Sequence, residues 1–335
     1  MIHVLAAVVR STKTVMEQTP NTQMKKDTAN KKDLFISKVK EIYPNEDILS
    51  LGTRFETFRI NTLANSSDEI LKKLADLGFE IKPGPFTNSY INFSSPEKKV
   101  SQTSLVDEHI LYIQGLSSML DAVVLNPKPN EKILDLCAAP GSKTTQIGIM
   151  AEGKAEIFAV ETNSNRFNFM KKTFANYGLE NIQTIKANAA ALVNIRPDLL
   201  EYFDKVLVDV PCSNEGNIRD IENFDFKFWN PKLPKKLSQL QKKLLATGIK
   251  MLKRGGELIY STCTYSLEEN EQVIEWALKH FPEVQLETIN FPEKNFVTGF
   301  THWKEKEFGE TLIKALRVLP NQYYAGFFIA RFVKN

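Results

Sequence analysis

The sequence predicts an α/β protein: a parallel sheet with helices on both faces, preceded by a small α+β module. Two observations support this fold class. In the second part of the chain, short apolar runs alternate with helical patterns, as in strands joined by crossover helices. Before them, residues 34–105 combine two helical patterns with short strand-like runs. A length of 335 residues is sufficient for one large or two modest domains.

The first part of the chain divides into a tail and the small module. We predict that residues 1–33 form a polar, flexible tail. FISKVKEIY, residues 35–43, has apolar residues three and four apart and predicts a helix. FRINTL then predicts a strand, and DEILKKLADLGFEI predicts a capped helix that ends at Gly78. Two further short strands complete the module over residues 34–105.

Residues 106–335 are predicted to form the main domain. Its first helix is expected in HILYIQGLSSMLDAVVL. The predicted strands are KILDL, EIFAVE, IQTIKA, KVLVDV and ELIYST, and the predicted helices lie at about 142–151, 164–177, 235–253 and 267–280. The final runs VQLETI and AGFFIARFV are expected to add an antiparallel pair of strands.

Composition and charge narrow the classes of protein. A net charge of +3 does not by itself indicate nucleic-acid binding. A cluster of basic residues fits either a solvated helix face or a track for RNA phosphates; it comprises Lys235, Lys236, Lys242, Lys243, Lys250, Lys253 and Arg254. Three widely spaced cysteines form neither a disulfide framework nor a zinc pattern. We therefore expect no metal site and a reducing compartment.

The location is expected to be the cytoplasm, and the protein is expected to act as a monomer. No apolar run approaches 20 residues, so no membrane span is expected. Residues 1–16 contain Arg10 and Lys13 but no acid, a composition that leaves import into an organelle open.

Small residues follow the first predicted strand of the main domain. They let the backbone turn tightly and present amide groups to a ligand at a helix N-terminus. A phosphate-binding loop is excluded because Ser142 separates Gly141 from Lys143, and the glycine spacing of a dinucleotide fingerprint is absent. The predicted cofactor loop consists of Cys137, Ala138, Ala139, Pro140, Gly141, Ser142 and Lys143.

Polar residues end the next two strands. Glu161 follows the second strand, where an acid commonly accepts hydrogen bonds from ribose hydroxyls. Asn188 follows the third and can bond an adenine edge through its amide. A nucleoside-type ligand without a phosphate therefore fits, and S-adenosylmethionine is the leading candidate. The alternative is that these are ordinary polar residues at strand ends.

Two cysteines stand where strands give way to loops. Cys212 in LVDVPCSNEG and Cys263 in ELIYSTCTYS each follow a β-branched apolar run. In an open α/β sheet that edge is where ligands bind. A thiol is suited to transient covalent attack on an electron-poor ring, but spacing alone does not show which thiol attacks. Cys137 is interpreted as a small apolar residue that shapes the cofactor loop.

These motifs resemble the Sun/Nop family of RNA cytosine carbon-5 methyltransferases. The resemblance rests on LDLCAAPGSKT, DVPCSNEGNIRD and YSTCTYSLEENEQV, and extends over roughly residues 50–333. It implies a seven-stranded, Rossmann-like class I methyltransferase sheet and an RNA-recognition-like fold for the small module. It also implies that residues 137–143, Glu161, Asn188 and Asp209 surround S-adenosylmethionine.

The resemblance further implies catalytic roles. Cys263 is expected to be the nucleophile and Cys212 to help release the product, with Lys143 and Asp209 near the base. The implied reaction transfers a methyl group to carbon-5 of cytidine in rRNA or tRNA, through a covalent cysteine–base adduct. The cytidine must be single-stranded or flipped out of a helix. Two alternatives are an RNA-binding assembly factor with this fold and little turnover, and a small-molecule methyltransferase.

Four residues depart from the family pattern, among them Val210, which stands where alanine is usual. Ser142 and Asn188 stand where glycine and aspartate are usual, and the amide oxygen of Asn188 can replace the lost carboxylate acceptor. Asn214 stands where glycine is usual and is expected to tolerate a left-handed conformation.

Further contacts with RNA are predicted close to Cys212. The segment 213–234 carries basic and aromatic residues that can grip phosphate and stack on bases, or else pack in the core; among them are Arg219, Phe224, Phe226, Phe228 and Trp229. Arg59 and Arg317 are additional candidates for contacts with the RNA backbone.

Overall fold

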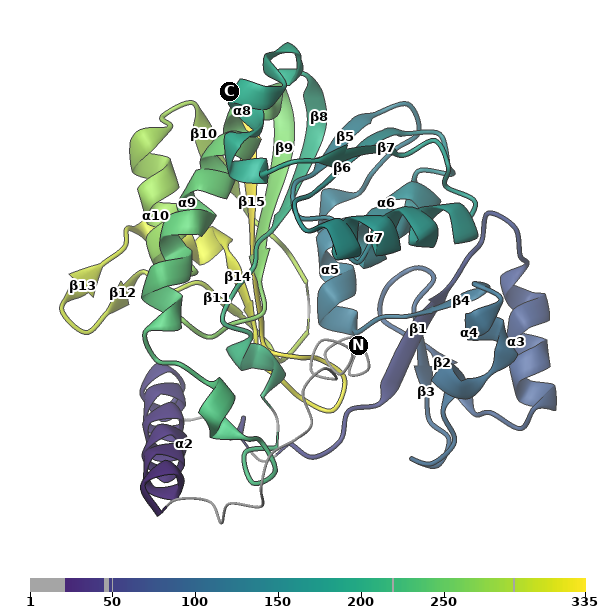
Figure 1. Cartoon of the computed structure of the whole chain (residues 1–335), viewed down its shortest axis with the longest axis horizontal. Coiled ribbons are helices and arrows are strands. Elements are labelled where there is room, and N and C mark those ends of the chain that lie inside the picture. The colour runs from purple at the N-terminus through teal and green to yellow at the C-terminus, as the bar shows by residue number, and fades with distance from the viewer. Residues whose placement is uncertain (1–21, 45–47, 50, 219, 292) are drawn as a thin grey trace, which may run out of the picture.

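The computed structural model describes residues 22–44, 48–49, 51–218, 220–291 and 293–335. Its elements form a large central sheet covered by helices and a smaller sheet beside it (Figure 1). None of the helices in these ranges is long and apolar enough to cross a membrane.

The small module is a four-stranded antiparallel sheet in the order β2-β3-β1-β4. Its elements are β1 (Glu56–Ile60), α3 (Ser67–Asp76), β2 (Ile81–Pro83), β3 (Tyr90–Asn92), η1 (Val100–Gln102), α4 (Ser104–Asp107) and β4 (Leu111–Ile113). The buried side chains of Phe58, Ile60 and Leu74 lie in its core. Because β4 pairs with β1, the small sheet extends beyond residue 105. The helix expected from His109 onward therefore begins only at Leu116.

The main sheet contains the five predicted parallel strands. They are β5 (Lys132–Asp135), β6 (Glu156–Glu161), β7 (Gln183–Lys186), β8 (Phe203–Asp209) and β9 (Leu252–Thr262), in the spatial order β7-β6-β5-β8-β9. This alternation of strand and helix was predicted from the sequence and is confirmed.

Antiparallel strands extend the sheet beyond β9. They are β10 (Val284–Glu287), β11 (Phe296–Thr298), β14 (Leu316–Val318) and β15 (Phe327–Lys334), and β15 pairs with β9, β14 and β10. The expected antiparallel pairing of the two final runs is thus confirmed. Nine strands are described in this sheet, against the seven implied by the resemblance, because β10 and β11 add to its antiparallel side.

Helices cover both faces of the sheet, as predicted for a Rossmann-like fold. One face packs against α5 (Leu116–Leu125), α6 (Ser142–Met150) and α7 (Ser164–Asn176). The other packs against α8 (Leu192–Ile195), α9 (Leu233–Met251) and α10 (Glu271–His280). The connections contain η2 (Ala189–Ala191), η3 (Pro197–Leu199), η4 (Glu215–Asn217), η5 (Phe226–Phe228), β12 (His302–Trp303), β13 (Lys306–Glu307) and η6 (Glu310–Lys314).

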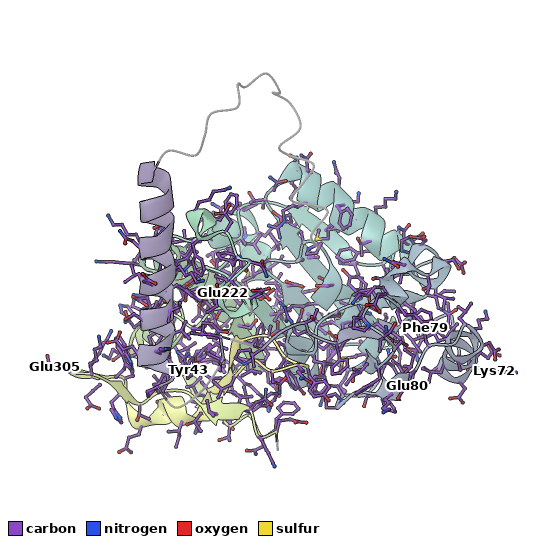
Figure 2. All side chains as sticks on the ribbon, turned by 90° about the horizontal axis from the view of Figure 1, so that it is seen from below. Tyr43, Lys72, Phe79, Glu80, Glu222 and Glu305 are labelled. Carbon is purple, nitrogen blue, oxygen red and sulfur yellow. The ribbon has the colours of Figure 1, made fainter. Side chains whose placement is uncertain are left out.

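Helix α2 (Thr22–Ile42) packs on the segment that follows Cys212. Buried Phe35 contacts the rings of Phe226 and Trp229, each with a centroid distance of 5.5 Å. Figure 2 shows α2 as a long helix with Tyr43 at its end. Residues 22–33 lie in this helix rather than in a flexible tail, whereas residues 1–21, including Arg10 and Lys13, are outside the described residues.

Arg59 and Arg317 are buried inside the protein, so their predicted contacts with RNA were wrong. Arg59 donates hydrogen bonds to Gln114 Oε1 (2.7 Å) and to the carbonyl of Ser142 (2.9 Å), which attaches the small module to α6. The prediction failed because the sequence around a charged residue in a strand-like run does not show which buried groups that residue will bond.

Arg317 joins three distant segments. It pairs with the buried carboxylate of Glu271 on α10 and donates to the hydroxyl of Tyr43 (2.7 Å) and the carbonyl of Tyr265 (3.2 Å). The end of α2, the start of α10 and β14 are thereby held at one point.

Replacing Glu271 by glutamine should destabilise the protein strongly. Glu271→Gln leaves the buried guanidinium of Arg317 without its counter-charge, so we expect the free energy of unfolding to fall by about 3–5 kcal/mol. Urea denaturation measures the change. Arg196→Gln is the control, because Arg196 pairs with Asp198 at the surface, where the denaturation midpoint should hardly move. Equal shifts in both variants would contradict this role of the buried pair.

Candidate active site

The predicted site residues follow the carboxyl ends of neighbouring strands. Across the order β7-β6-β5-β8-β9 lie, in turn, Asn188, Glu161, the loop 137–143, Asp209 and the loop that carries Cys263. The chain runs outward from β5 through β6 and β7, then crosses to the other side of β5 to form β8 and β9. Ligands bind at such a topological switch point in open α/β sheets.

The cofactor loop turns sharply between β5 and α6. Gly141 has a φ of 104° in the left-handed region, and a Cβ there would come within 3.0 Å of the Phe174 ring, so the position requires glycine. Asp135 closes the base of the loop: its carboxylate accepts from Thr144 Oγ1 at 2.7 Å and from the amide of Cys137 at 3.2 Å. Burial raises the pKa of the Cys137 thiol well above its ordinary value, which agrees with a packing role for this residue.

Glu161 and Asn188 end their strands in different environments. Glu161 is buried, and its carboxylate accepts from the amide of Asn163 (2.7 Å) and pairs with Arg166 (3.2 Å). Asn188 is exposed, and its amide oxygen accepts from the backbone N–H of Ala190 at 3.1 Å, capping η2. That cap uses one of the two acceptor positions of the oxygen that was expected to replace a carboxylate.

Lys143, at the start of α6, lies between two aspartates. Its Nζ is 3.0 Å from Asp121 Oδ2 and forms a second ion pair with Asp209 Oδ2. Ser261 Oγ donates to the other oxygen of Asp209 at 3.3 Å. Burial opposes the charge on Lys143, but the two carboxylates outweigh it and raise the pKa of Lys143, so its ammonium remains charged. The predicted proximity of Lys143 and Asp209 is present in the structure.

Sequence analysis missed Asp121. This residue is fully buried on α5, in the run LSSMLDAVVL, where it is the only charged residue. A lone acid in an apolar helix is the signal that could have identified it, because a buried carboxylate needs a partner.

The structure brings the two expected thiols together. Cys212 Sγ and Cys263 Sγ are 3.2 Å apart, and the amide of Cys263 donates to Cys212 Sγ at 3.3 Å. Cys263 Sγ also contacts Asn214 Oδ1 at 2.9 Å. Asn214 has a φ of 59°, the left-handed conformation expected for it. The hydrogen bond with Cys263, together with burial, raises the pKa of the Cys212 thiol well above its ordinary value.

The residue after each cysteine holds the two loops together. Ser213 Oγ and Thr264 Oγ1 are hydrogen-bonded at 2.7 Å. Glu269 accepts from the amide of Ser213 at 3.1 Å and from Gln241 Nε2 at 2.7 Å. Because these groups are buried or half-buried, the hydrogen bonds restrict both loops.

Glu215 connects the Cys212 loop to α2. Its fully buried carboxylate accepts from Thr264 Oγ1 (3.1 Å) and Trp229 Nε1 (3.1 Å), and it pairs with Lys38 Nζ on α2 (2.8 Å). The backbone of the next residue, Gly216, donates to the carbonyl of Cys263 at 3.0 Å. The position of Cys212 therefore depends on α2 as well as on the sheet.

The aromatic residues after Cys212 are mostly structural. Phe226 and Trp229 are buried against α2, and Phe224 packs partly against the same core. Only Phe228, with 75% of its surface exposed, remains available to a base among the four predicted aromatics. Arg219 is outside the described residues.

The charges of the site fit a cationic nucleoside. The one ammonium of Lys143 already pairs with Asp121 and Asp209, so it is not free to bind a phosphate. Buried carboxylates favour a positive charge nearby, and Glu161 can accept from ribose hydroxyls. S-adenosylmethionine has both a sulfonium cation and a ribose, so the residues present fit this cofactor.

Solved structures show the same fold. A methyltransferase homologue from Pyrococcus horikoshii is 28% identical to this chain, with a TM-score of 0.77, and the match covers 94% of this chain and 100% of the other. NSun6 from the same organism, solved with SFG, is 23% identical, with a TM-score of 0.70 and coverage of 92% and 97%. The fold and site define a Rossmann-like methyltransferase that uses S-adenosylmethionine.

The family described as 16S rRNA methyltransferase RsmB/F matches residues 122–333, and this chain belongs to it. The tRNA (cytosine(49)-C(5))-methyltransferase of Pyrococcus abyssi is 34% identical over 282 residues, which are 83% of this chain and 88% of that relative. Ribosomal RNA small subunit methyltransferase F of Vibrio parahaemolyticus is 31% identical over 90% of this chain, which spans 63% of that relative's length. These relatives confirm the resemblance to the Sun/Nop family.

Gly216→Ala should disturb both cysteine loops. A Cβ at Gly216 would lie 2.2 Å from the carbonyl oxygen of Gly326, so the backbone has to move. We expect the free energy of unfolding to fall by about 2 kcal/mol and methyl transfer to fall at least tenfold. Denaturation and an activity assay measure the two effects. Gly115→Ala is the control, because a Cβ there meets open space. A Gly216→Ala protein as stable and active as this control would refute the close packing of the loops.

Proposed function

We propose that this protein methylates carbon-5 of cytidine in RNA through a covalent adduct between Cys263 and the base. The observation that carries the proposal is the pair of free thiols 3.2 Å apart, on the loops that follow strands β8 and β9. Asp209 and Lys143 form an ion pair at the same carboxyl-end side of the sheet. The names of the relatives indicate tRNA or rRNA as the substrate.

Cytosine chemistry accounts for these residue types. Carbon-5 is too weak a nucleophile to accept a methyl group unaided. Addition of a thiolate at carbon-6 breaks the ring conjugation and makes carbon-5 an enamine-type nucleophile. When bound, S-adenosylmethionine supplies an electrophilic methyl group. The carbon-5 proton must then leave before the thiolate can be expelled, which requires a proton acceptor late in the reaction.

The two thiols suit different steps. From the family resemblance, we assign the attack to Cys263 and the release step to Cys212. Asp209, at the carboxyl end of β8, is assigned to hydrogen-bond the ring nitrogen of the base. The loop 137–143, Glu161 and Asn188 are assigned to the cofactor, together with Asp209.

The substrate cytidine reaches these thiols as a single-stranded or flipped base, and we propose that one copy of the protein acts on the RNA. A reducing compartment such as the cytoplasm suits two free thiols at this separation, since an oxidising one favours disulfide formation. The complete set of thiols and charged groups supports catalysis over the alternative of an RNA-binding assembly factor.

Cys263→Ala should abolish methyl transfer. Without the nucleophile, transfer of labelled methyl from S-adenosylmethionine to RNA is expected to fall at least about a thousandfold. Binding of the cofactor, measured by calorimetry, should remain within a factor of about three. Wild-type protein that binds RNA but transfers no label would favour the assembly-factor alternative. Sequencing of bisulfite-treated RNA from cells with and without the protein identifies the cytidine.

Cys212→Ala should trap the reaction after attack. Because Cys263 can still add to the base while release is impaired, a covalent protein–RNA adduct is expected to accumulate. A denaturing gel with labelled RNA measures it, and competition by unlabelled bulk RNA separates RNA from small-molecule substrates. Cys263→Ala in the same assay should give no adduct. Adduct in Cys263→Ala and none in Cys212→Ala would reverse the two roles.

A further inference from the structure

Asp121 is a buried acid that the reaction described above does not use. Its side chain is fully buried on α5, whereas the side chains of Lys143 and Asp209 are 11% and 28% exposed. Exposure therefore rises along the row from Asp121 through Lys143 to Asp209. Asp121 contacts Lys143 from the closed end of this row, and Asp209 meets it at the end that a base can reach.

The groups around Asp121 carry an excess of negative charge. Lys143 faces it from α6, Asp209 from β8 and the uncharged hydroxyl of Ser261 from β9. Asp135 on β5 interacts with the same lysine and with Asp209. Lys143 is thus the one cation in this described group of three carboxyl groups. Burying unmatched negative charge is costly, so the cluster binds protons readily.

The proton affinity of the cluster lies close to neutral pH. Burial raises the pKa of Asp121 to about 7 and that of Asp135 to about 6. Asp135 uses its two oxygens to accept hydrogen bonds from Thr144 and the amide of Cys137. Asp121 and Asp209 instead share the ammonium of Lys143, so a proton taken up by this pair belongs to both aspartates.

We propose that Asp121 is a positioning residue for methyl transfer: it neutralises Lys143 from the buried side, so that Asp209 can hold a proton for the ring nitrogen of the target cytosine. This inference rests on the proposed function. It assigns to Asp121 no contact with substrate or cofactor, because its whole side chain is enclosed.

The charge balance explains why a second aspartate is needed. If Lys143 faced Asp209 alone, the two would form a neutral ion pair, and an ionised Asp209 could only accept hydrogen bonds. With Asp121 present, one aspartate matches the ammonium while the other carries the proton. Asp209 is the more exposed of the two aspartates. A proton on Asp209 can therefore be passed to the ring nitrogen of the base.

The proton movement then balances the covalent step. As Cys263 Sγ forms a bond to carbon-6, the carbon-5–carbon-6 double bond shifts to carbon-4–carbon-5. The electron pair of the carbon-4–nitrogen-3 double bond moves onto nitrogen-3, which takes the proton from Asp209. The carbon-4–carbon-5 electron pair then bonds to the donated methyl group, the carbon-4–nitrogen-3 double bond re-forms and nitrogen-3 returns its proton to Asp209. On release the carbon-5 proton passes to a base, its electron pair forms the carbon-5–carbon-6 double bond, and the sulfur–carbon bond breaks to return Cys263 as a thiolate.

Asp121→Asn tests the inference. The amide keeps the shape of the side chain but removes its charge, so Lys143 then pairs with Asp209 alone and holds it ionised. At pH 7.5 we expect single-turnover methyl transfer to RNA to slow by about 10- to 100-fold. The rate is measured with S-adenosylmethionine saturating, and the dissociation constant for RNA should change less than about threefold, because the side chain of Asp121 is enclosed.

The pH profile separates positioning from a purely structural role. Burial raises the pKa of Asp121 to about 7, so we expect the coupled pair to lose its proton, and the rate to decline, as pH rises through that range. In Asp121→Asn the full charge of Lys143 acts on Asp209, and the decline should move to lower pH. Equal slowing at every pH would overturn the proposal.

A control and a double mutant complete the test. Ser117→Ala lies on the same helix and removes a buried hydrogen bond to the carbonyl of Ala325, so it should lower stability and leave the pH profile unchanged. In a Lys143→Met background, Asp121→Asn should have almost no further effect on the rate, since Asp121 acts through Lys143. Additive effects would contradict that coupling. If Asp121→Asn does not fold, Asp121→Ser serves in the same assays.

The outcomes also distinguish this inference from the proposed function. Wild-type protein that leaves carbon-5 of cytidine unmodified would overturn the proposed function and the role of Asp121 with it. Wild-type protein that modifies it, alongside an Asp121→Asn variant with the wild-type rate and pH profile, would overturn only the role of Asp121.

Discussion

The pairing of one ammonium with two aspartates is the constraint around which the active site is built. Lys143 begins α6, Asp121 lies within α5 and Asp209 ends β8, so the three charges join a helix, the cofactor loop and a central strand. Removal of Lys143 leaves two aspartates without a counter-charge in a site largely closed to water, which is strongly unfavourable. The same arrangement engages the ammonium of Lys143, which is therefore not free to bind a phosphate, and its carboxylates favour a cationic methyl donor. Cofactor preference and the arrangement of the strand ends therefore have a common electrostatic cause.

A second set of buried polar contacts fixes the thiols. Apolar packing alone does not orient loops, because it has little directional preference. Here the residues around Cys263 supply the direction: Thr262 bonds Asn270 Oδ1 at 2.6 Å, and the hydroxyl of Tyr260 donates to the carbonyl of Glu269 at 2.6 Å. Ser261, Thr262 and Thr264 of this motif are buried, and each makes a side-chain hydrogen bond. The two sulfur atoms are close as a result of this network.

The parts outside the main sheet are attached to the same site. The small module is held through Arg59 to the first turn of α6, directly after the cofactor loop. Helix α2 is held through Lys38 to Glu215, three residues after Cys212. The small module and α2 are therefore connected by hydrogen bonds and ion pairs to the cofactor loop and the Cys212 loop. The surface elements are coupled to the chemistry by the ion pairs and hydrogen bonds that join them.

The sequence by itself determined the alternation of strands and helices and the order of the motifs. It also determined that Glu161, Asp209 and the two thiols lie at the carboxyl ends of the parallel strands. These features follow from local periodicity and from the rule that parallel strands finish at one edge. Tertiary structure alone decided that β4 pairs with β1, that Arg59 and Arg317 are internal, and that Asp121 belongs to the site. Each of these depends on a partner distant in sequence, which local patterns do not identify.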